Sequence, residues 1–304
     1  MKDDTFSIMV DTGCDLPPEF MAEHGIEVLP ITFNLDGAEY ETGNWQNISS
    51  KEFYNALRTG SIAKTSQINP MAYTEVFTEY AKSGRDLILL VLSSGLSGTY
   101  QSAQVALQDV KENYPGCNIY SIDSISASVG IGMLATIAVE KRREGLSAKE
   151  TAAILEEKKH RCVGLFTVDD LMYLHRGGRL SMFSAIAGSV LSIKPVLNLA
   201  PDGRLALKGR ARGRKASMKL LVEQFKRSIA PAAALDTVFI THTDCENDAN
   251  LLAEMVKEAA DIRRVIVMTM GPIIGAHVGP GALILLFEAN MTRQEYEDKF
   301  YGKK

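Results

Sequence analysis

Cysteine is scarce in this chain and follows no pattern. The 304 residues hold four cysteines, Cys14, Cys117, Cys162 and Cys245, which are far apart and form no C-x-x-C pair. Disulfide-rich scaffolds and zinc sites both need cysteines at short, regular spacing. The sequence therefore predicts reduced, partly buried thiols of the kind found in cytoplasmic proteins, and no metal site built on them.

Long apolar runs are absent as well. Ala282–Phe287 is typical of the runs present, whereas a helix needs about 20 apolar residues to cross a bilayer. The first residues, Met1-Lys2-Asp3-Asp4, are acidic and lead straight into a strand pattern, unlike a secretory signal. We expect no stable membrane insertion and a cytoplasmic location.

Neither sign of charge dominates. The formal net charge is −4, with 46% hydrophobic and 23% charged residues, which is ordinary for a soluble globular protein. A weakly acidic chain of this kind is not expected to bind nucleic acid. It also lacks the glycine-rich lysine loop that cradles nucleotide phosphates, so we expect no ATP site in the chain itself.

Apolar runs alternate with amphipathic stretches through the first half of the chain. This alternation predicts an α/β domain over residues 1–160, with a mostly parallel sheet and helices on its faces. Strands are predicted at Phe6–Val10, Ile26–Phe33, Leu87–Leu92 and Asn118–Ile122. Helices are predicted near Pro17-Pro18 and at Ser50–Arg58, Pro70–Lys82, Ser97–Lys111, Ala127–Glu144 and Ala148–His160.

A second α/β domain is predicted over residues 161–304. Pro201-Asp202-Gly203 is a turn signal that joins two antiparallel strands, so this sheet is expected to be mixed. No Pro-, Gly- or Ser-rich linker separates the halves, which predicts close packing with a cleft between them. Strands are predicted at Cys162–Thr167, Lys194–Leu199, Thr237–Thr241, Val265–Met270 and Ala282–Phe287, and helices at 182–191, Ala216–Ile229 and Asp248–Ala260.

Two hydroxyl-rich segments fall where such a fold places its binding loops. One is Lys64-Thr65-Ser66-Gln67, and the other runs from Leu92 to Thr99 directly after an apolar strand. Ser97-Gly98-Thr99 then leads into a helical stretch, so hydroxyls and free backbone N–H groups lie together, which suits an anion. Helix capping is the alternative interpretation of Thr65 and Ser97.

These residues also carry a resemblance. Thr65-Ser66-Gln67 and Ser93-Ser94-Gly95-Leu96-Ser97-Gly98-Thr99 resemble the DegV family, and three further segments agree in the family's order along nearly the whole chain. They are Val10-Asp11-Thr12-Gly13-Cys14-Asp15-Leu16, Arg176-Gly177-Gly178-Arg179-Leu180-Ser181 and Gly271 to Gly281. The resemblance implies a fatty-acid-binding protein that presents its acyl chain, held in a tunnel between the domains, to a separate fatty acid kinase that makes acyl phosphate for phospholipid synthesis.

The resemblance also implies roles for individual residues. Thr65 and Ser97 would bind the fatty acid carboxylate, and Ser66 and Ser94 would support the same loops. His277, in a loop between glycines, would lie near the carboxylate, although a lone histidine can equally be structural. Arg176 and Arg179 would contact the pocket or the partner, or cap a helix. No cofactor or metal is implied, only a long-chain fatty acid as ligand.

A basic run follows in the second half. Lys208, Arg210, Arg212, Arg214, Lys215 and Lys219 put six cations into twelve residues. Such a run is commonly a solvated face, and without interleaved aromatics it does not indicate nucleic-acid binding. The sharper alternative is a surface for an acidic or nucleotide-holding partner, and Arg212, beside Arg210, matches the family position that contacts the kinase.

Two rival functions and two misleading motifs remain. A serine hydrolase for acyl esters would use Ser97, His277 and Asp123, although Gly95-Leu96-Ser97-Gly98-Thr99 departs from the nucleophile elbow at its last residue. A lipid-sensing module without a carrier role is the other rival.

Gly130-x-Gly132-x-x-Ala135 fits the dinucleotide fingerprint but falls inside a helical pattern, and His242-Thr243-Asp244-Cys245 is too short to be a metal ligand set.

The chain departs from the family pattern in three places. Thr12 follows Asp11 where serine is common, Gln67 is followed by Ile68-Asn69-Pro70 rather than directly by proline, and His175 replaces a longer basic residue. None of these removes a proposed ligand contact. Chain length, unsaturation, the tail-lining residues, the oligomeric state and the identity of the kinase do not follow from the sequence.

Overall fold

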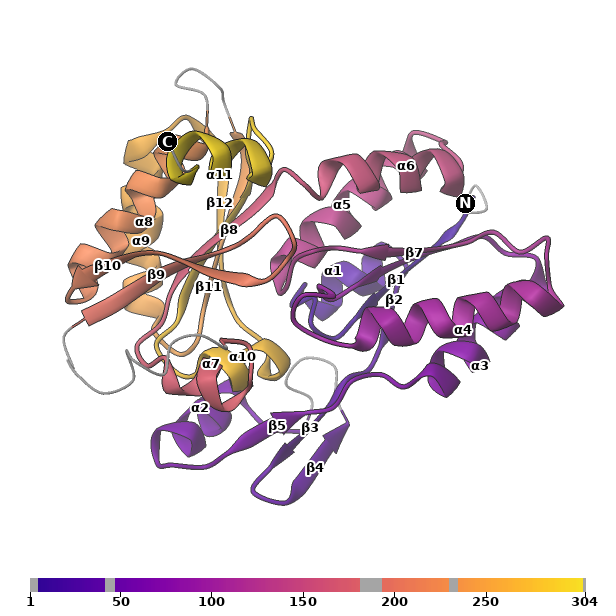
Figure 1. The fold of residues 1–304 in the computed structure, drawn as a ribbon, viewed down its shortest axis with the longest axis horizontal. Coiled ribbons are helices and arrows are strands. Elements are labelled where there is room, and N and C mark those ends of the chain that lie inside the picture. The colour runs from indigo at the N-terminus through magenta and orange to yellow at the C-terminus, as the bar shows by residue number, and fades with distance from the viewer. Residues whose placement is uncertain (1–4, 42–46, 181–192, 230–234, 303–304) are drawn as a thin grey trace.

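The computed structural model describes residues 5–41, 47–180, 193–229 and 235–302. Figure 1 shows two lobes side by side, one built on a parallel sheet and the other on a mixed sheet, with a smaller antiparallel sheet beside them. The α/β fold and the two sheet types expected from the sequence are confirmed, while the division at residues 160 and 161 stays a prediction.

The first lobe has a four-stranded parallel sheet in the order β2-β1-β6-β7. Its two central strands, β1 and β6, are fully buried, as expected for a parallel sheet covered by helices, whereas the edge strands β2 and β7 are partly exposed. The strands are β1 (Ser7–Asp11), β2 (Ile26–Leu29), β6 (Leu87–Val91) and β7 (Ile119–Asp123), and the helices are α1 (Pro18–Glu23), α3 (Pro70–Ser83), α4 (Thr99–Asn113), α5 (Val129–Arg143) and α6 (Ala148–Lys158).

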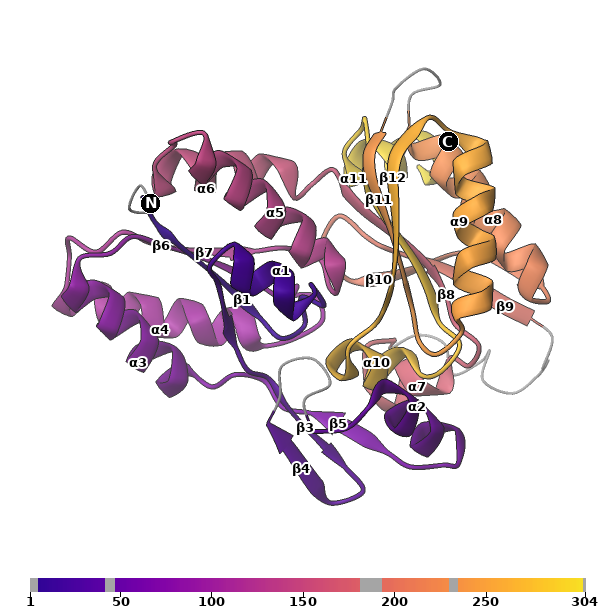
Figure 2. The ribbon, with the colours of Figure 1, turned by 180° about the vertical axis from the view of Figure 1, so that it is seen from behind.

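The second lobe has a six-stranded mixed sheet in the order β10-β9-β8-β13-β11-β12, in which only β11 and β12 pair in parallel. Figure 2 shows α8 and α9 along the outer face of this sheet. The strands are β8 (Cys162–Thr167), β9 (Ile193–Leu199), β10 (Leu205–Arg212), β11 (Leu235–His242), β12 (Ile262–Thr269) and β13 (Leu283–Glu288), and the helices are α8 (Arg214–Ser228) and α9 (Glu246–Ala259).

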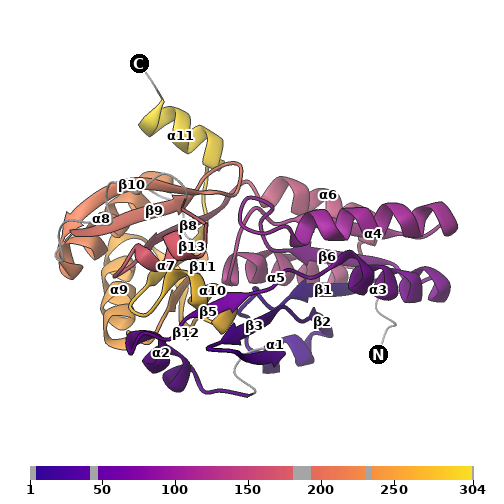
Figure 3. The same cartoon turned by 60° about the horizontal axis from the view of Figure 1, so that its bottom comes forward.

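The predicted strand Ile26–Phe33 is wrong, because it is two strands in two different sheets. β2 ends at Leu29, Pro30 follows, and β3 (Thr32–Leu35) belongs to an antiparallel sheet with β4 (Ala38–Glu41) and β5 (Ala63–Thr65). Proline has no N–H to donate to a sheet ladder, so it separates the two strands. Figure 3 shows that β5 lies beside α10 (Pro272–Val278), a helix from the far end of the chain.

Helix α10, the final helix α11 (Arg293–Tyr301) and the small sheet's later strands were not predicted. The predicted turn at Pro201-Asp202-Gly203 does join two antiparallel strands, β9 and the edge strand β10, and the helix capped by the Arg176–Arg179 turn is α7 (Met172–Arg176). Helix α2 (Ser50–Arg58) has the predicted bounds. The predicted helix at 182–191 and Ser181 lie outside the described residues. In the described part of the chain, no helix is both long and apolar enough to cross a membrane.

Helix α5 explains the dinucleotide-like glycines. A Cβ placed on Gly132 would lie 2.7 Å from Leu16 Cγ, and one on Gly130 would overlap Ser126 Oγ and lie 3.0 Å from a Leu286 methyl. The first two contacts are too short for a real side chain and the third is tight, so these glycines allow α5 to pack closely against its neighbours. The interpretation as helix packing is confirmed.

Candidate functional site

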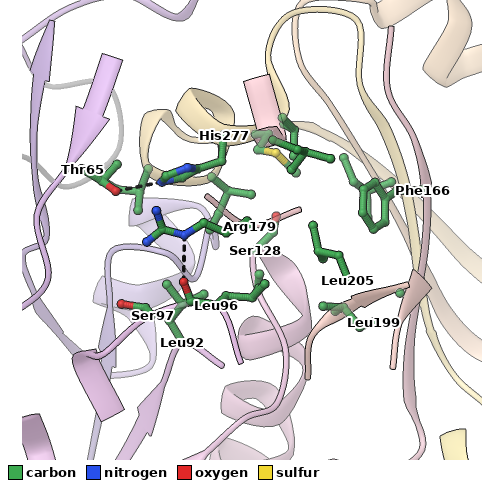
Figure 4. A pocket seen from close by; sticks show the side chains of 18 of the residues that line it. Thr65, Leu92, Leu96, Ser97, Ser128, Phe166, Arg179, Leu199, Leu205 and His277 are labelled. Atoms are coloured by element: carbon green, nitrogen blue, oxygen red, sulfur yellow. Dashed lines mark hydrogen bonds between the residues drawn. The ribbon is translucent and has the colours of Figure 1, made fainter. Parts of the chain in front are cut away.

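A cavity lies between the lobes, beyond the carboxyl ends of the parallel strands. It holds about 820 Å³ of space not filled by atoms, part of it open to solvent, and Figure 4 shows its side chains. Most of the wall is apolar and comes from both halves of the chain: Ile31, Leu92, Leu96, Ala127, Phe166, Leu174, Leu199, Leu205, Met270, Ile273, Ile274, Val278, Ile284 and Leu286.

The polar side chains gather at one end of this cavity. Thr65, at the end of β5, and His277, in α10, are joined by a hydrogen bond of 2.8 Å between Thr65 Oγ1 and His277 Nε2. Ser97 and Arg179 lie beside them in Figure 4, opposite Phe166 and its apolar neighbours. Four residues that the sequence analysis considered for a carboxylate site therefore lie close together: Thr65, Ser97, Arg179 and His277.

Arg179 is the one charged side chain among the described residues that line the cavity. Its Nε donates to Leu96 O at 2.9 Å, so the guanidinium is anchored to the same loop that carries Ser97. It also donates to Gly177 O, just before Gly178, whose left-handed backbone (φ 70°) ends α7. The helix-capping role of this turn is confirmed, and Arg179 faces the cavity in addition.

Ser97 is half-buried, shapes its own loop and also faces the cavity. Its hydroxyl oxygen lies 2.9 Å from Thr99 Oγ1 and accepts a hydrogen bond from Thr99 N at 3.2 Å, which shapes the first turn before α4. The same side chain lines the cavity. The N-cap of α4 is Gly98, without a side-chain capping bond, so the capping interpretation of Ser97 is wrong. A hydroxyl can donate and accept at once, so the bonds to Thr99 leave Ser97 able to contact a ligand.

His277 is neutral at physiological pH. Burial, followed by the positive charge of Arg179, lowers the pKa of His277 to about 4. The predicted loop around His277 is wrong, because Pro272 begins a helix and Gly279, with φ 70°, follows its end. Proline at the first helical position and glycine after the last are a helix signature that was available in the sequence.

Two buried aspartates hold the segments that surround the cavity. Asp11 accepts hydrogen bonds from Leu92 N (2.6 Å) and Gly13 N (2.9 Å). Asp15 accepts from the Ser128 hydroxyl (2.7 Å) and Gly271 N (2.9 Å), so it ties the start of α5 to the start of α10. Burial raises the pKa of Asp11 to about 6 and that of Asp15 to about 7.

The other predicted residues of the two hydroxyl-rich segments, Ser66 and Ser94, differ in whether they line the cavity. Ser66 lines the cavity, whereas Ser94 is exposed and does not, although its backbone N–H donates to Asp123 Oδ1 at 3.1 Å. Arg176 is exposed, lies 5.0 Å from the centre of the Tyr173 ring and borders a shallow groove outside Thr65 and His277. A direct contact between Ser94 or Arg176 and a ligand stays a prediction.

The basic run separates into paired and exposed cations. Lys208 is buried against Glu297 (2.5 Å), and Arg214 is bonded to Asp248 (2.9 Å). Arg210 and Arg212 are exposed on β10, at one edge of the six-stranded sheet, and Lys215 and Lys219 are exposed on α8. Two of the six cations are therefore explained by the fold, and the others form a solvent-facing surface.

The residues of the rival hydrolase do not form a triad. His277 Nε2 is bonded to Thr65 rather than Ser97, and His277 Nδ1 has no hydrogen-bond partner within the described residues. Asp123 Oδ1 instead accepts from Ser94 N and Ile125 N, which shapes the loop after β7. A triad needs the base to contact the nucleophile and to be oriented by the acid, and neither contact is made.

The cysteines and the residues of metal-binding type are not arranged as a site in the described ranges. The four cysteines are unpaired. The described ranges contain no group of three His, Cys, Asp or Glu residues placed to hold a metal ion. His242 Nδ1 accepts from Cys245 N at 3.3 Å, which accounts for that segment as a turn.

The family model and the relatives found by comparison with known sequences all point to one family. A family model described as "Uncharacterised protein, DegV family" matches residues 5–290. A DegV domain-containing protein of Clostridium perfringens is 38% identical over 282 residues, which cover 93% of this chain and 97% of that protein. One from Streptococcus pyogenes serotype M3 is 39% identical over 289 residues, covering 95% and 100%.

Solved structures with this fold include proteins described by their fatty acid binding. A DegV family protein from Thermus thermophilus, described with fatty acid binding, has a TM-score of 0.83 at 30% identity and covers 93% of this chain and 99% of its own. A fatty acid binding DegV family protein from Streptococcus agalactiae has a TM-score of 0.83 at 27% identity, covering 94% and 99%. The Streptococcus pneumoniae Fatty Acid Kinase B3 protein, loaded with linoleic acid, shares the fold at 21% identity, with a TM-score of 0.78 and coverage of 94% and 99%. On the family match and these relatives, this chain belongs to the DegV family.

Proposed function

We propose that this protein binds a long-chain fatty acid, with the carboxylate at Thr65, Ser97, His277 and Arg179 and the tail in the apolar part of the cavity. The observation that carries the proposal is the division of the wall into one polar end and an apolar remainder. No carboxylate lines the cavity among the described residues, and a guanidinium does. That arrangement favours an anionic head group on an apolar chain.

The tail provides the affinity in this proposal. Burying an acyl chain is worth roughly 0.8 kcal/mol per CH₂ group, so a tail of ordinary length supplies about 10 kcal/mol before the cost of association is subtracted. A carboxylate contributes little net affinity because it is costly to remove from water. The hydroxyls, the neutral imidazole and Arg179 then orient the head group and limit that cost.

The protein is proposed to present the bound acid to a separate fatty acid kinase rather than to act as an enzyme itself. Two observations support this part: the Ser97, His277 and Asp123 side chains are not arranged for ester hydrolysis, and Arg212 is exposed at a sheet edge. The kinase partner itself is inferred from the chain's resemblance to the DegV family. The acid and its phosphorylated product are proposed to be the small molecules carried.

The test is the double variant Thr65→Ala with Ser97→Ala, measured by isothermal titration with palmitate and with methyl palmitate. We expect the affinity for palmitate to fall roughly tenfold or more, because hydrogen bonds to a charged group are lost, while the affinity for the ester changes little. The matched control is Thr59→Ala with Ser83→Ala, whose hydroxyls bond only local backbone. Unchanged palmitate binding in the Thr65 and Ser97 variant would show that the head-group site lies elsewhere.

A further inference from the structure

Ser93, just before the exposed Ser94, is fully buried and uses every polar atom it has. Its backbone N–H donates to Ser126 O at 2.9 Å. Its carbonyl oxygen accepts from Leu96 N (2.9 Å) and Ser97 N (3.0 Å). The backbone that carries the Ser97 hydroxyl is therefore held by Ser93.

The Ser93 hydroxyl connects this loop to the other half of the chain. It accepts a hydrogen bond from Gly95 N at 3.1 Å and donates one to Gly203 O at 2.9 Å. Gly203 lies in the turn between β9 and β10, 110 residues away. One side chain thus joins the head-group loop of the first lobe to a hairpin of the second.

The two turns meet backbone to backbone. Gly203 has φ 75°, and a Cβ there would overlap the Ser93 hydroxyl and lie 3.1 Å from Ile125 Cα. A Cβ on Gly95 would lie 2.8 Å from both Gly203 C and Arg204 N. Because neither glycine carries a side chain, the two turns approach closely enough for the Ser93 hydroxyl to bridge them.

The same hairpin is a wall of the cavity. Leu199 and Leu205 pair across it, on either side of the turn, and both line the cavity. Buried Arg293 holds the turn from behind, donating to Ala200 O at 3.4 Å and to Ile125 O at 2.6 Å. The hairpin therefore touches the tail region through its leucines and the head-group loop through Ser93.

We infer that Ser93 is a positioning residue for the carboxylate site, which sets the place of Ser97 by tying its loop to the β9–β10 turn. The inference rests on the proposed fatty acid binding. Its consequence is specific to the head group: loss of the Ser93 hydroxyl lets the loop shift relative to the cavity, so the free acid loses its advantage over the methyl ester. The tail contacts made by the hairpin, through Leu199 and Leu205, are expected to stay, because β9 and β10 remain paired.

The experiment measures the ratio of the Kd for methyl palmitate to the Kd for palmitate in Ser93→Ala. We expect this ratio to fall about tenfold, since a hydrogen bond to a charged group is weakened, with ester affinity retained. Ser93→Thr keeps a hydroxyl and is expected to keep the ratio. Ser228→Ala removes another fully buried serine hydroxyl, bonded to Gln224 O at 2.9 Å, and controls for a general loss of stability.

A parental ratio in folded Ser93→Ala would overturn the inference, and so would an equal loss of affinity for acid and ester. If Ser93→Ala does not fold, Gly203→Ala disturbs the same contact from the hairpin, and an unchanged ratio there overturns the inference equally. A wild-type protein that binds neither palmitate nor its ester would instead refute the proposed function. The two failures are therefore distinguishable.

Discussion

Thr65 and His277 are 212 residues apart in the chain and share a hydrogen bond of 2.8 Å at the polar end of the cavity. Thr65 is carried by the small antiparallel sheet and His277 by α10, and these two elements pack against each other. The bond joins the first and last thirds of the chain. The proposed head-group site consequently forms only in the folded protein, so substitutions there are expected to affect stability as well as binding.

The His277 imidazole should make stability depend on pH. Its folded-state pKa of about 4 lies below the ordinary 6.5, so the unfolded chain takes up a proton first as the pH falls. The stabilisation is complete above about pH 6.5 and is lost as the pH falls toward 4. Between about pH 7.5 and about pH 4.5, urea unfolding should show wild type losing about 2 kcal/mol more than His277→Gln.

Asp11 and Asp15 have raised pKa values and act in the opposite direction, but both proteins contain them, so their effect cancels in this comparison. Equal losses in wild type and His277→Gln would mean that the imidazole is not held neutral by burial.

Gly164 should set the length of tail that fits. It lies in β8 and lines the cavity, and a Cβ there would be 3.2 Å from Leu199 and 3.4 Å from Leu286 methyl carbons. Gly164→Leu should weaken stearate binding by about 2 kcal/mol, at roughly 0.8 kcal/mol for each displaced CH₂, and laurate binding less. Gly116→Leu is the control, since a Cβ there meets open space. Equal losses for both acids would place Gly164 away from the tail.

Arg212 should serve the partner rather than the ligand. Arg212→Ala is expected to leave palmitate affinity nearly intact and to lower acyl-phosphate formation with a cognate fatty acid kinase, because exposed rim charges mainly affect association. The difference from wild type should shrink at higher salt, since salt screens the charge that the variant removes. Arg263→Ala, an exposed arginine on the opposite edge strand β12, is the matched control. Lost palmitate binding with unchanged kinase binding would assign Arg212 to the cavity.

Asp15 should be replaceable by asparagine but not by alanine. Alanine leaves Gly271 N and the Ser128 hydroxyl without their buried acceptor, which should cost about 2–3 kcal/mol in urea unfolding. Asparagine keeps an acceptor oxygen, tolerates the left-handed backbone at φ 55°, and removes a charge that burial disfavours. Similar stabilities for the two variants would show that these hydrogen bonds contribute little.

The sequence by itself determined the alternation of strands and helices and the segments that carry polar groups. Helix α2 and strand β8 have the predicted bounds, because periodicity and capping residues such as Ser49 act within a few positions. The hydroxyl-rich segments around Thr65 and Ser97 stood out for the same local reason, but their assignment to a carboxylate came from the family resemblance, because local placement alone favoured helix capping.

Only the tertiary structure decided which of these groups meet. Ser93 and Ser94 are adjacent and identical, yet one is buried on Gly203 and the other faces solvent. The bond from Thr65 to His277, the cavity wall shared by Phe166 and Leu205, and the break of one predicted strand into two sheets all depend on packing between segments far apart in the chain. Local periodicity carries no information on such contacts, since they are selected by the burial and hydrogen bonding of the whole fold.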